Sequence, residues 1–247
     1  MKVLITRPRA QADSFAEVLR KAGCEPIFFP VIEIRPIEKN IALERAISKL
    51  GCYNWVVFTS VNGVDAFFDT LPASVNVERT GVKVAAIGPK TAQALESRGV
   101  HPDFVPVEYV AEAILPGLGD LRGKWVLLPR AEIARKALPE AITAAGGVPH
   151  EIAVYRTVPT EPDSEGLARL QSGVDAVTFT SPSTVANFVR IVQQAGLDPL
   201  RLPNQPLVIC IGPITREAAK EAGFASVLSA NEYTTEGLVE LIRQIHR

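Results

Sequence analysis

Hydroxyl-bearing and basic residues follow several apolar stretches of this 247-residue chain, and their types and positions could do chemistry. Each apolar stretch is typical of a buried strand, and each polar segment stands where a helix should begin. Helix N-termini present unpaired backbone N–H groups and the positive end of the helix dipole, so these turns are suited to binding anions. The turns are Thr6-Arg7-Pro8, Thr59-Ser60, Gly88-Pro89-Lys90-Thr91, Pro129-Arg130, Thr180-Ser181-Pro182-Ser183-Thr184 and Gly212-Pro213-Ile214-Thr215.

A purely structural interpretation exists for any one of these turns. Ser and Thr are common N-cap residues, and Gly-Pro is a cap followed by proline at the first helical position. The whole set is harder to explain in this way, because uncharged caps do not need Arg7 and Arg130 beside them. We therefore predict an anion-binding site at the ends of the strands.

The signature motifs of several other enzyme classes are missing from the sequence. No G-x-G-x-x-G, P-loop or G-x-S-x-G motif follows a strand. The only histidines are His101, His150 and His246, which do not form a triad or metal pattern, and we expect His150 in a surface loop. Acid–base work would fall to carboxylates, tyrosine or water.

The chain also repeats itself at about half its length. Arg7 recurs as Arg130, and Phe58-Thr59-Ser60 as Phe179-Thr180-Ser181, at spacings of 123 (130 minus 7) and 121 (179 minus 58). Ile87-Gly88-Pro89 returns as Ile211-Gly212-Pro213, and Tyr109 as Tyr233. This predicts two duplicated lobes with a cleft between them. Tyr155 breaks the pattern, because Ile32 stands at its matching position.

The elements that must position these residues alternate between strand and helix. Apolar runs predict buried parallel strands, and period-3.6 patterns after 3–5 and 125–128 predict surface helices, so the fold class is α/β. The extended segments 27–37 and 152–159 occupy equivalent positions and could pair as a two-stranded hinge. The other predicted strands are Trp55–Phe58, Val84–Ile87, Ala176–Phe179 and Leu207–Ile211.

Composition excludes some partners and says little about others. The net charge is -1, from 26 basic and 27 acidic residues, so no global field favours nucleic acid or an anionic membrane. No stretch resembles a signal peptide or a membrane span, and we expect a cytoplasmic protein. Cys24, Cys52 and Cys210 lack metal spacing and are expected to be buried free thiols.

Several motifs in order resemble the uroporphyrinogen-III synthase family. They are Ile5-Thr6-Arg7-Pro8, the two Phe-Thr-Ser turns, the two Ile-Gly-Pro motifs, Val154-Tyr155-Arg156-Thr157 and Tyr233-Thr234-Thr235-Glu236-Gly237-Leu238. The resemblance runs from end to end. It implies two flavodoxin-like parallel-sheet lobes joined by the two-stranded hinge, near 30–37 and 152–159. One lobe would comprise 1–35 with 157–247, and the other 36–156.

The resemblance also implies a reaction. The family's substrate, hydroxymethylbilane, is a linear tetrapyrrole with acetate and propionate side chains. It loses its hydroxyl as water and closes with the last pyrrole ring inverted, through a spiro intermediate, to give uroporphyrinogen III. No metal or organic cofactor is implied. The expected protein is a monomer whose only further partner would be a transient one, the preceding pathway enzyme.

Site residues follow from the resemblance position by position. Tyr155 matches the tyrosine proposed to assist departure of the hydroxyl. Contacts to substrate carboxylates are expected from Thr59, Ser60, Thr91, Ser181, Ser183 and Thr215, with Arg7 and Arg130 as electrostatic helpers or helix caps. Val61-Asn62 departs from the family pattern, in which many members have a basic turn.

Two other classes of function share parts of this pattern. A non-catalytic two-lobed module that binds a small polyanion would share the duplication and the hinge. A flavodoxin-like flavin or nucleotide protein would share the lobe fold, but it should also carry a phosphate loop, which this sequence lacks.

Overall fold

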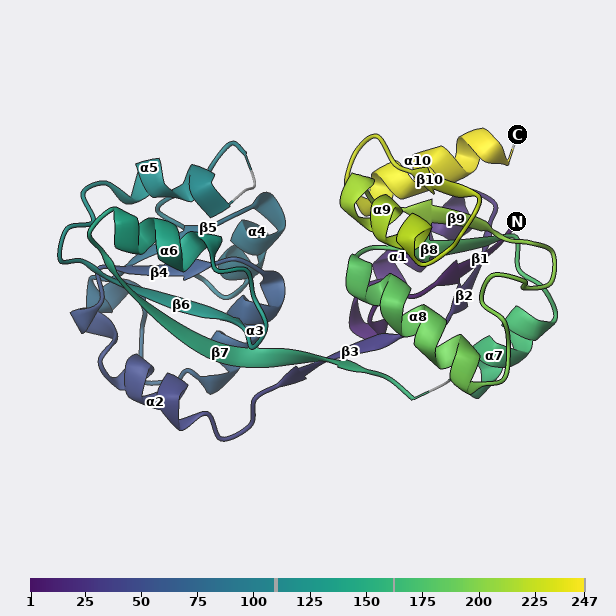
Figure 1. The fold of residues 1–247 in the computed structure, drawn as a ribbon. Coiled ribbons are helices and arrows are strands. Elements are labelled where there is room, and N and C mark those ends of the chain that lie inside the picture. The colour runs from purple at the N-terminus through teal and green to yellow at the C-terminus, as the bar shows by residue number, and fades with distance from the viewer. Residues whose placement is uncertain (109–110, 162, 247) are drawn as a thin grey trace. The chain divides into compact units, whose positions relative to one another are not determined.

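The computed structural model describes residues 1–108, 111–161 and 163–246, and it divides into two compact units (Figure 1). The first unit contains Met1–Glu33 and Val158–Arg247, and the second contains Ile34–Thr157. The sequence-based division at 35/36 and 156/157 falls within the same two strands, β3 (Ile32–Pro36) and β7 (Val148–Pro159). These strands are neighbours in the second sheet. Tyr109, one landmark of the predicted repeat, lies outside the described residues.

The first unit is a five-stranded sheet with helices on both faces. The strand order is β10-β9-β8-β1-β2, and the pairs β1–β2, β1–β8, β8–β9 and β9–β10 are parallel. Its strands are β1 (Lys2–Ile5), β2 (Glu25–Phe28), β8 (Ala176–Phe179), β9 (Leu207–Cys210) and β10 (Val227–Ser229). Its helices are α1 (Arg9–Lys21), α7 (Ser164–Gln171), α8 (Pro182–Gln194), α9 (Pro213–Glu221) and α10 (Thr235–Ile245).

Alternation along β1 shows why both faces of this sheet are covered. Val3 and Ile5 pack with α1 and α10, whereas Leu4 packs on the opposite face with α7, α8 and α9. Successive side chains of a strand point to opposite faces, so a continuous apolar run needs a helical layer on each side. The expected α/β class with parallel sheets is thus confirmed.

The second unit repeats this architecture. Its sheet has the order β3-β7-β6-β4-β5, with parallel pairs β7–β6, β6–β4 and β4–β5. Besides β3 and β7, its strands are β4 (Trp55–Phe58), β5 (Lys83–Ala86) and β6 (Trp125–Ala131). Its helices are α2 (Ile41–Ser48), α3 (Val61–Thr70), α4 (Pro89–Ser97), α5 (Leu115–Leu118) and α6 (Ala137–Ala144), with 3₁₀ turns at Leu50–Cys52, Glu78–Thr80 and Ala111–Ile114.

The two sheets place corresponding strands in the same order. The predicted repeat matches β1 with β6, β8 with β4 and β9 with β5. In both sheets these three strands are neighbours in that order. On their other sides, β1 is next to β2 and β6 is next to β7. A duplication would produce this agreement, and the duplication itself stays a prediction.

Two local expectations need correction. Cys52 is exposed at the end of a 3₁₀ turn, whereas Cys24 and Cys210 are buried as expected. Burial raises the pKa of Cys24, and it raises that of Cys210 to about 12. His150 lies within β7 and not in a loop, because β7 begins at Val148, four residues earlier than the expected hinge segment at 152.

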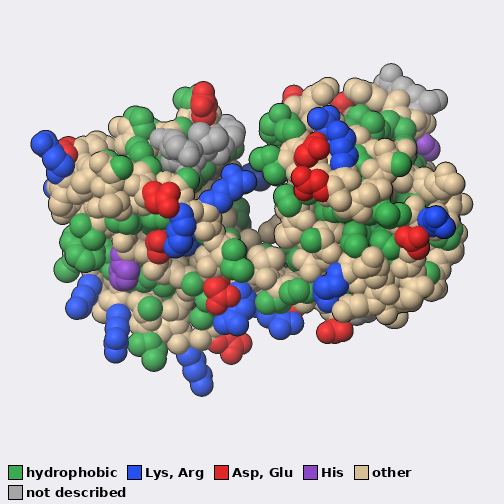
Figure 2. Space-filling model, in the orientation of Figure 1, with side chains coloured by type: hydrophobic (Ala, Val, Ile, Leu, Met, Phe, Trp, Pro, Cys, Tyr) green, Lys and Arg blue, Asp and Glu red, His purple; other side chains and the backbone are tan. Residues whose placement is uncertain are grey.

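The distribution of charge on the surface and the character of the helices bear on the partners considered from composition. On the face shown in Figure 2, acidic and basic side chains are intermixed. Within the described ranges, no helix combines the length and the apolar character that a membrane crossing requires.

Close packing of α3 on β6 generates the first prediction. A Cβ added to Gly63 would lie 2.9 Å from the carbonyl oxygen of Pro129, so the helix start or the strand must shift. Overpacking costs about 1–3 kcal/mol, and better helix propensity returns at most about 1 kcal/mol. We expect Gly63→Ala to lower the free energy of unfolding in urea by about 1 kcal/mol.

Gly51→Ala is the matched control. Its added Cβ would come no closer than 3.2 Å to the carbonyl oxygen of Thr80, so the loss should be smaller. A Gly63→Ala protein that is more stable than the parent would contradict the packing argument.

Candidate functional site

The predicted turns of the second unit gather at one edge of its sheet. Strands β4, β5 and β6 are parallel neighbours, so the segments that follow them emerge together at their carboxyl ends. Helix α3 begins directly after β4, and α4 begins directly after β5. The positive ends of two helix dipoles therefore lie at the same edge, where they favour a bound anion.

Ser60 caps α3 and meets Tyr155. Its hydroxyl oxygen accepts a hydrogen bond of 3.1 Å from the backbone N–H of Gly63, and lies 3.1 Å from the Tyr155 hydroxyl. Tyr155 is 8 % exposed and belongs to the cluster formed with α2, α3 and α4. Two hydroxyls from residues 95 positions apart thus share one hydrogen bond at a helix N-terminus.

A β-bulge aims the Tyr155 side chain at this helix. Arg130 pairs with Ala153, but the next residue, Ala131, pairs with Tyr155, so Val154 is the extra residue in β7. Side chains normally alternate along a strand, yet Val154 and Tyr155 both join the same core cluster. Bulges re-aim side chains in this way and are common beside active sites.

The hydroxyl pair can deliver a proton. Because Ser60 already accepts from Gly63, its own O–H can donate to the Tyr155 oxygen, which leaves the Tyr155 O–H to donate to a bound group. The reverse donation is equally available within the same 3.1 Å contact. The arrangement therefore suits a weak general acid next to a helix start that favours an anion.

The other threonines of this edge occupy different positions. Thr59 is half-buried before the cap. Thr91 is 6 % exposed in the first turn of α4, whose N-cap is Gly88. Gly88 has no side chain that could accept a hydrogen bond, so among the described groups the backbone N–H donors of this turn have no N-cap side-chain partner. An anionic ligand could take that role.

The first unit presents the same two kinds of helix start. Ser181 caps α8 in a capping box with Thr184, and its hydroxyl lies 2.9 Å from that of Ser183. Thr215 is 4 % exposed in the first turn of α9, whose N-cap is Gly212. Strands β8 and β9 are parallel neighbours, so both helix starts lie at one edge.

Sequence reasoning gave Tyr233 no role in a site. Its ring carbon lies 3.1 Å from where a Cβ on Gly212 would stand, and its side chain is 66 % exposed at the start of α9. An exposed aromatic ring beside an anion-binding turn could stack on a ring of a ligand. The signal available in the sequence was its position in the predicted repeat.

Arg7 follows β1 in the first unit. Its guanidinium donates a hydrogen bond of 3.1 Å to the Gln11 side chain. Burial lowers the pKa of Arg7, and the charge of Glu236 acts in the opposite direction. A cation that is partly removed from water in this way gains from a further anionic contact.

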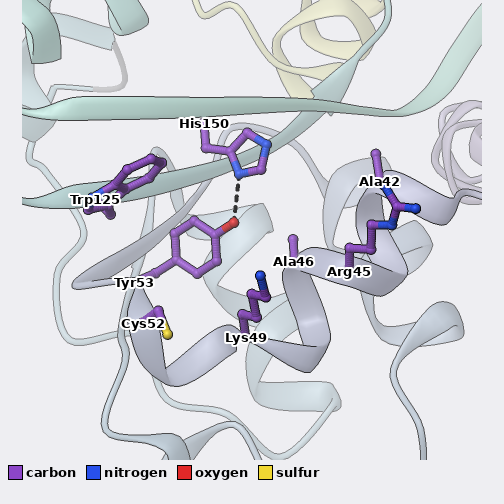
Figure 3. Close-up of a pocket in the computed structure, with 8 residues that line it drawn as sticks. All are labelled: Ala42, Arg45, Ala46, Lys49, Cys52, Tyr53, Trp125 and His150. Atoms are coloured by element: carbon purple, nitrogen blue, oxygen red, sulfur yellow. Dashed lines mark hydrogen bonds between the residues drawn. The ribbon is translucent and has the colours of Figure 1, made fainter.

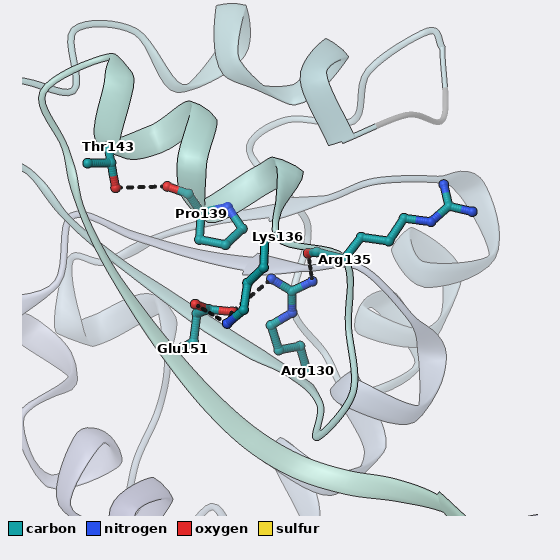
Figure 4. A network of polar contacts seen from close by, with 6 residues as sticks. All are labelled: Arg130, Arg135, Lys136, Pro139, Thr143 and Glu151. Atoms are coloured by element: carbon teal, nitrogen blue, oxygen red, sulfur yellow. Dashed lines mark hydrogen bonds and ion pairs between the residues drawn. The ribbon is translucent and has the colours of Figure 1, made fainter.

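Arg130 is engaged inside the second unit (Figure 4). Its side chain is 7 % exposed. The guanidinium donates a hydrogen bond of 3.1 Å to the Glu151 carboxylate and one of 2.5 Å to the carbonyl oxygen of Arg135. Lys136 binds the same Glu151 carboxylate at 3.2 Å. Arg130 therefore holds the segment between β6 and α6, which is a structural role. The electrostatic contact with a ligand expected from its sequence position stays a prediction.

The neighbouring Arg135 has the exposure that Arg130 lacks. Figure 4 shows its side chain directed away from the network, although its backbone carbonyl accepts from Arg130. Arg135 is exposed in the segment after β6, at the carboxyl edge of the sheet. Sequence reasoning missed it, because it stands five residues beyond the strand-end arginine.

The fold and the site define a class. It is a two-unit α/β protein with helix N-termini at strand ends and a part-buried hydroxyl pair beside one of them. Residues 13–240 match the family model described as uroporphyrinogen-III synthase HemD. The chain belongs to the uroporphyrinogen-III synthase family.

Individual relatives cover almost the whole chain. It is 30 % identical to the uroporphyrinogen-III synthase of Synechococcus elongatus, over 98 % of this chain and 94 % of that protein. Its fold is similar to the crystal structure of uroporphyrinogen-III synthetase from Helicobacter pylori, with a TM-score of 0.68, 18 % identity and 99 % of each chain covered. The fold is also similar to the crystal structure of a mutant uroporphyrinogen III synthase from Thermus thermophilus. The TM-score is 0.64 and the identity 22 %, and the match covers 100 % of this chain and 99 % of that one.

The different surroundings of Arg130 and Arg135 lead us to expect different effects of mutation on stability. Arg130→Met should lower the free energy of unfolding by about 1–3 kcal/mol, because Glu151 and the Arg135 carbonyl lose a buried donor. Arg135→Met, which replaces an exposed side chain, should change it by no more than about 0.5 kcal/mol. Urea unfolding of both variants measures the difference, and equal losses would remove the structural role given to Arg130.

Proposed function

We propose that this protein converts hydroxymethylbilane to uroporphyrinogen III, closing the ring with inversion of the last pyrrole and loss of water. The observation that carries the proposal is the family match over residues 13–240, with relatives named as synthases over nearly the full chain. A non-catalytic polyanion-binding module is not favoured, because the relatives that match this chain are named as enzymes.

Tyr155 is proposed to assist departure of the hydroxyl group. The pyrrole π-system expels the hydroxyl, so the leaving oxygen needs only one proton to depart as water. The Tyr155 O–H can supply that proton or a hydrogen bond, and Ser60 can donate to the phenol oxygen in turn. The start of α3 beside this pair can hold a substrate carboxylate.

Positioning is the larger part of the proposed catalysis. Unaided closure of the free bilane gives the isomer in which no ring is inverted, so the protein must select which carbon attacks. Substrate carboxylates are assigned to the first turns of helices α3, α4, α8 and α9 and to nearby arginines. The residues proposed from the sequence are Arg7, Thr59, Ser60, Thr91, Arg130, Ser181, Ser183 and Thr215. The exposed cation Arg135 is added to them from the structure.

The finer expectations on partners and location stay proposals. A small-molecule substrate fits the family. A cytoplasmic monomer that contacts the preceding pathway enzyme only transiently is compatible with the net charge of -1 and with three cysteines that are all free thiols.

The direct test supplies freshly made hydroxymethylbilane to the purified chain. We expect the oxidised product to be the type III isomer, formed at a rate proportional to protein concentration without added metal or cofactor. Chromatography of the isomers provides the measurement. Type I alone, at the rate seen without protein, would refute the proposed function.

A second test concerns Tyr155. Tyr155→Phe should lower kcat about a hundredfold, the low end for general acid catalysis, because the leaving group departs readily. The product should remain type III, since the turns that position the substrate are unchanged. Initial rates of type III formation measure the effect.

Tyr53→Phe is the matched control. Tyr53 lies in the same unit and its hydroxyl is hydrogen-bonded to His150, at the opposite end of the strands. This variant should keep full turnover. Equal rates for the two variants would remove Tyr155 from the mechanism and leave positioning alone.

A further inference from the structure

A pocket in the second unit lies away from the proposed catalytic edge. It has a volume of 460 Å³ and is lined by Ala42, Arg45, Ala46, Lys49, Cys52, Tyr53, Trp125 and His150 (Figure 3). Tyr53 stands just before β4, and Trp125 is the first residue of β6. The pocket is therefore at the amino ends of these strands, whereas α3 and α4 begin at their carboxyl ends. Its volume falls in the range of small-molecule sites.

Helix α2 supplies one wall of this pocket through a single face. Ala42, Arg45, Ala46 and Lys49 follow the spacing i, i+3, i+4, i+7, so they lie along one side of the helix. The small side chains of the two alanines leave space for a ligand, and the two cations lie at the border of that space. Both basic side chains are exposed, and no ion pair to either is found in the part of the chain that the structure describes.

Aromatic rings supply the other wall. Tyr53 and His150 stack with ring centroids 5.8 Å apart, and the Tyr53 hydroxyl and His150 Nδ1 share a hydrogen bond of 2.6 Å. Trp125 packs edge-on against Tyr53 at 6.5 Å, yet it is 48 % exposed. The rings are held in place by one another, and part of the large indole still faces solvent.

We propose that this pocket binds a planar aromatic carboxylate. The ring of the ligand would cover the exposed part of Trp125 and pack against Tyr53, and its carboxylate would pair with Arg45 and Lys49. Fixed aromatic surfaces bind flat rings at low entropic cost, and two cations on one helix face select for an anionic group. This site is independent of the synthase activity.

The test uses naphthalene-2-carboxylate as the probe and calorimetric titration of the full chain. The carboxylate should bind at one site, at least tenfold more tightly than naphthalene-2-methanol, which has the same rings and no charge. The double variant Arg45→Gln/Lys49→Gln should weaken binding of the carboxylate at least tenfold and leave binding of the alcohol unchanged.

Two further variants complete the design. Arg201→Gln replaces a side chain that is 88 % exposed in the first unit and should leave binding of the carboxylate unchanged. Ala42→Phe should abolish binding by filling the pocket from an exposed helix position. Bound carboxylate should also slow the labelling of Cys52 by a thiol reagent.

The proposal is overturned by any one of three results. These are no binding of the carboxylate at millimolar concentration, equal binding of carboxylate and alcohol, or unchanged binding in the double variant.

Discussion

Parallel pairing of neighbouring strands is the constraint on which the candidate site depends. Because β4, β5 and β6 run in one direction, every segment that follows them emerges at one edge. Helix dipoles, cap hydroxyls and Arg135 are thereby brought together from separate parts of the chain. The same pairing of β8 with β9 collects Ser181, Ser183 and Thr215 in the first unit. No single turn has an unusual sequence, and their common edge makes them a candidate site.

Much of this framework could be predicted because it depends on local pattern. The apolar runs 55–58 and 176–179 are the exact spans of β4 and β8, and the period-3.6 apolar residues after β1 lie in α1. Apolar strands need cover on both faces, which accounts for the correct fold class. Sequence reasoning did not single out α2 and α7, and it mistook His150 for a loop residue.

The site was predicted less completely, because it depends on contacts between distant residues. The contact between Tyr155 and Ser60 requires the bulge at Val154, and a one-residue register shift leaves no mark in composition or periodicity. The different exposure of Arg130 and Arg135 has a similar cause. A strand-end arginine can point to ligand or turn inward, and only the carboxylate of Glu151 decides which.

The discontinuous first unit has a consequence for synthesis of the chain. Strand β1 pairs with β8, so the unit lacks its central ladder until residue 176 and beyond have been made. The second unit is continuous and can fold while the ribosome is still at work. At 5–20 residues per second, β1 and β2 then wait roughly ten to thirty seconds for their partner. During that interval the apolar residues Val3, Leu4 and Ile5 lack the β8 partner that buries them. Premature termination after residue 157 would leave all of the second unit attached to an N-terminal segment without most of its own unit.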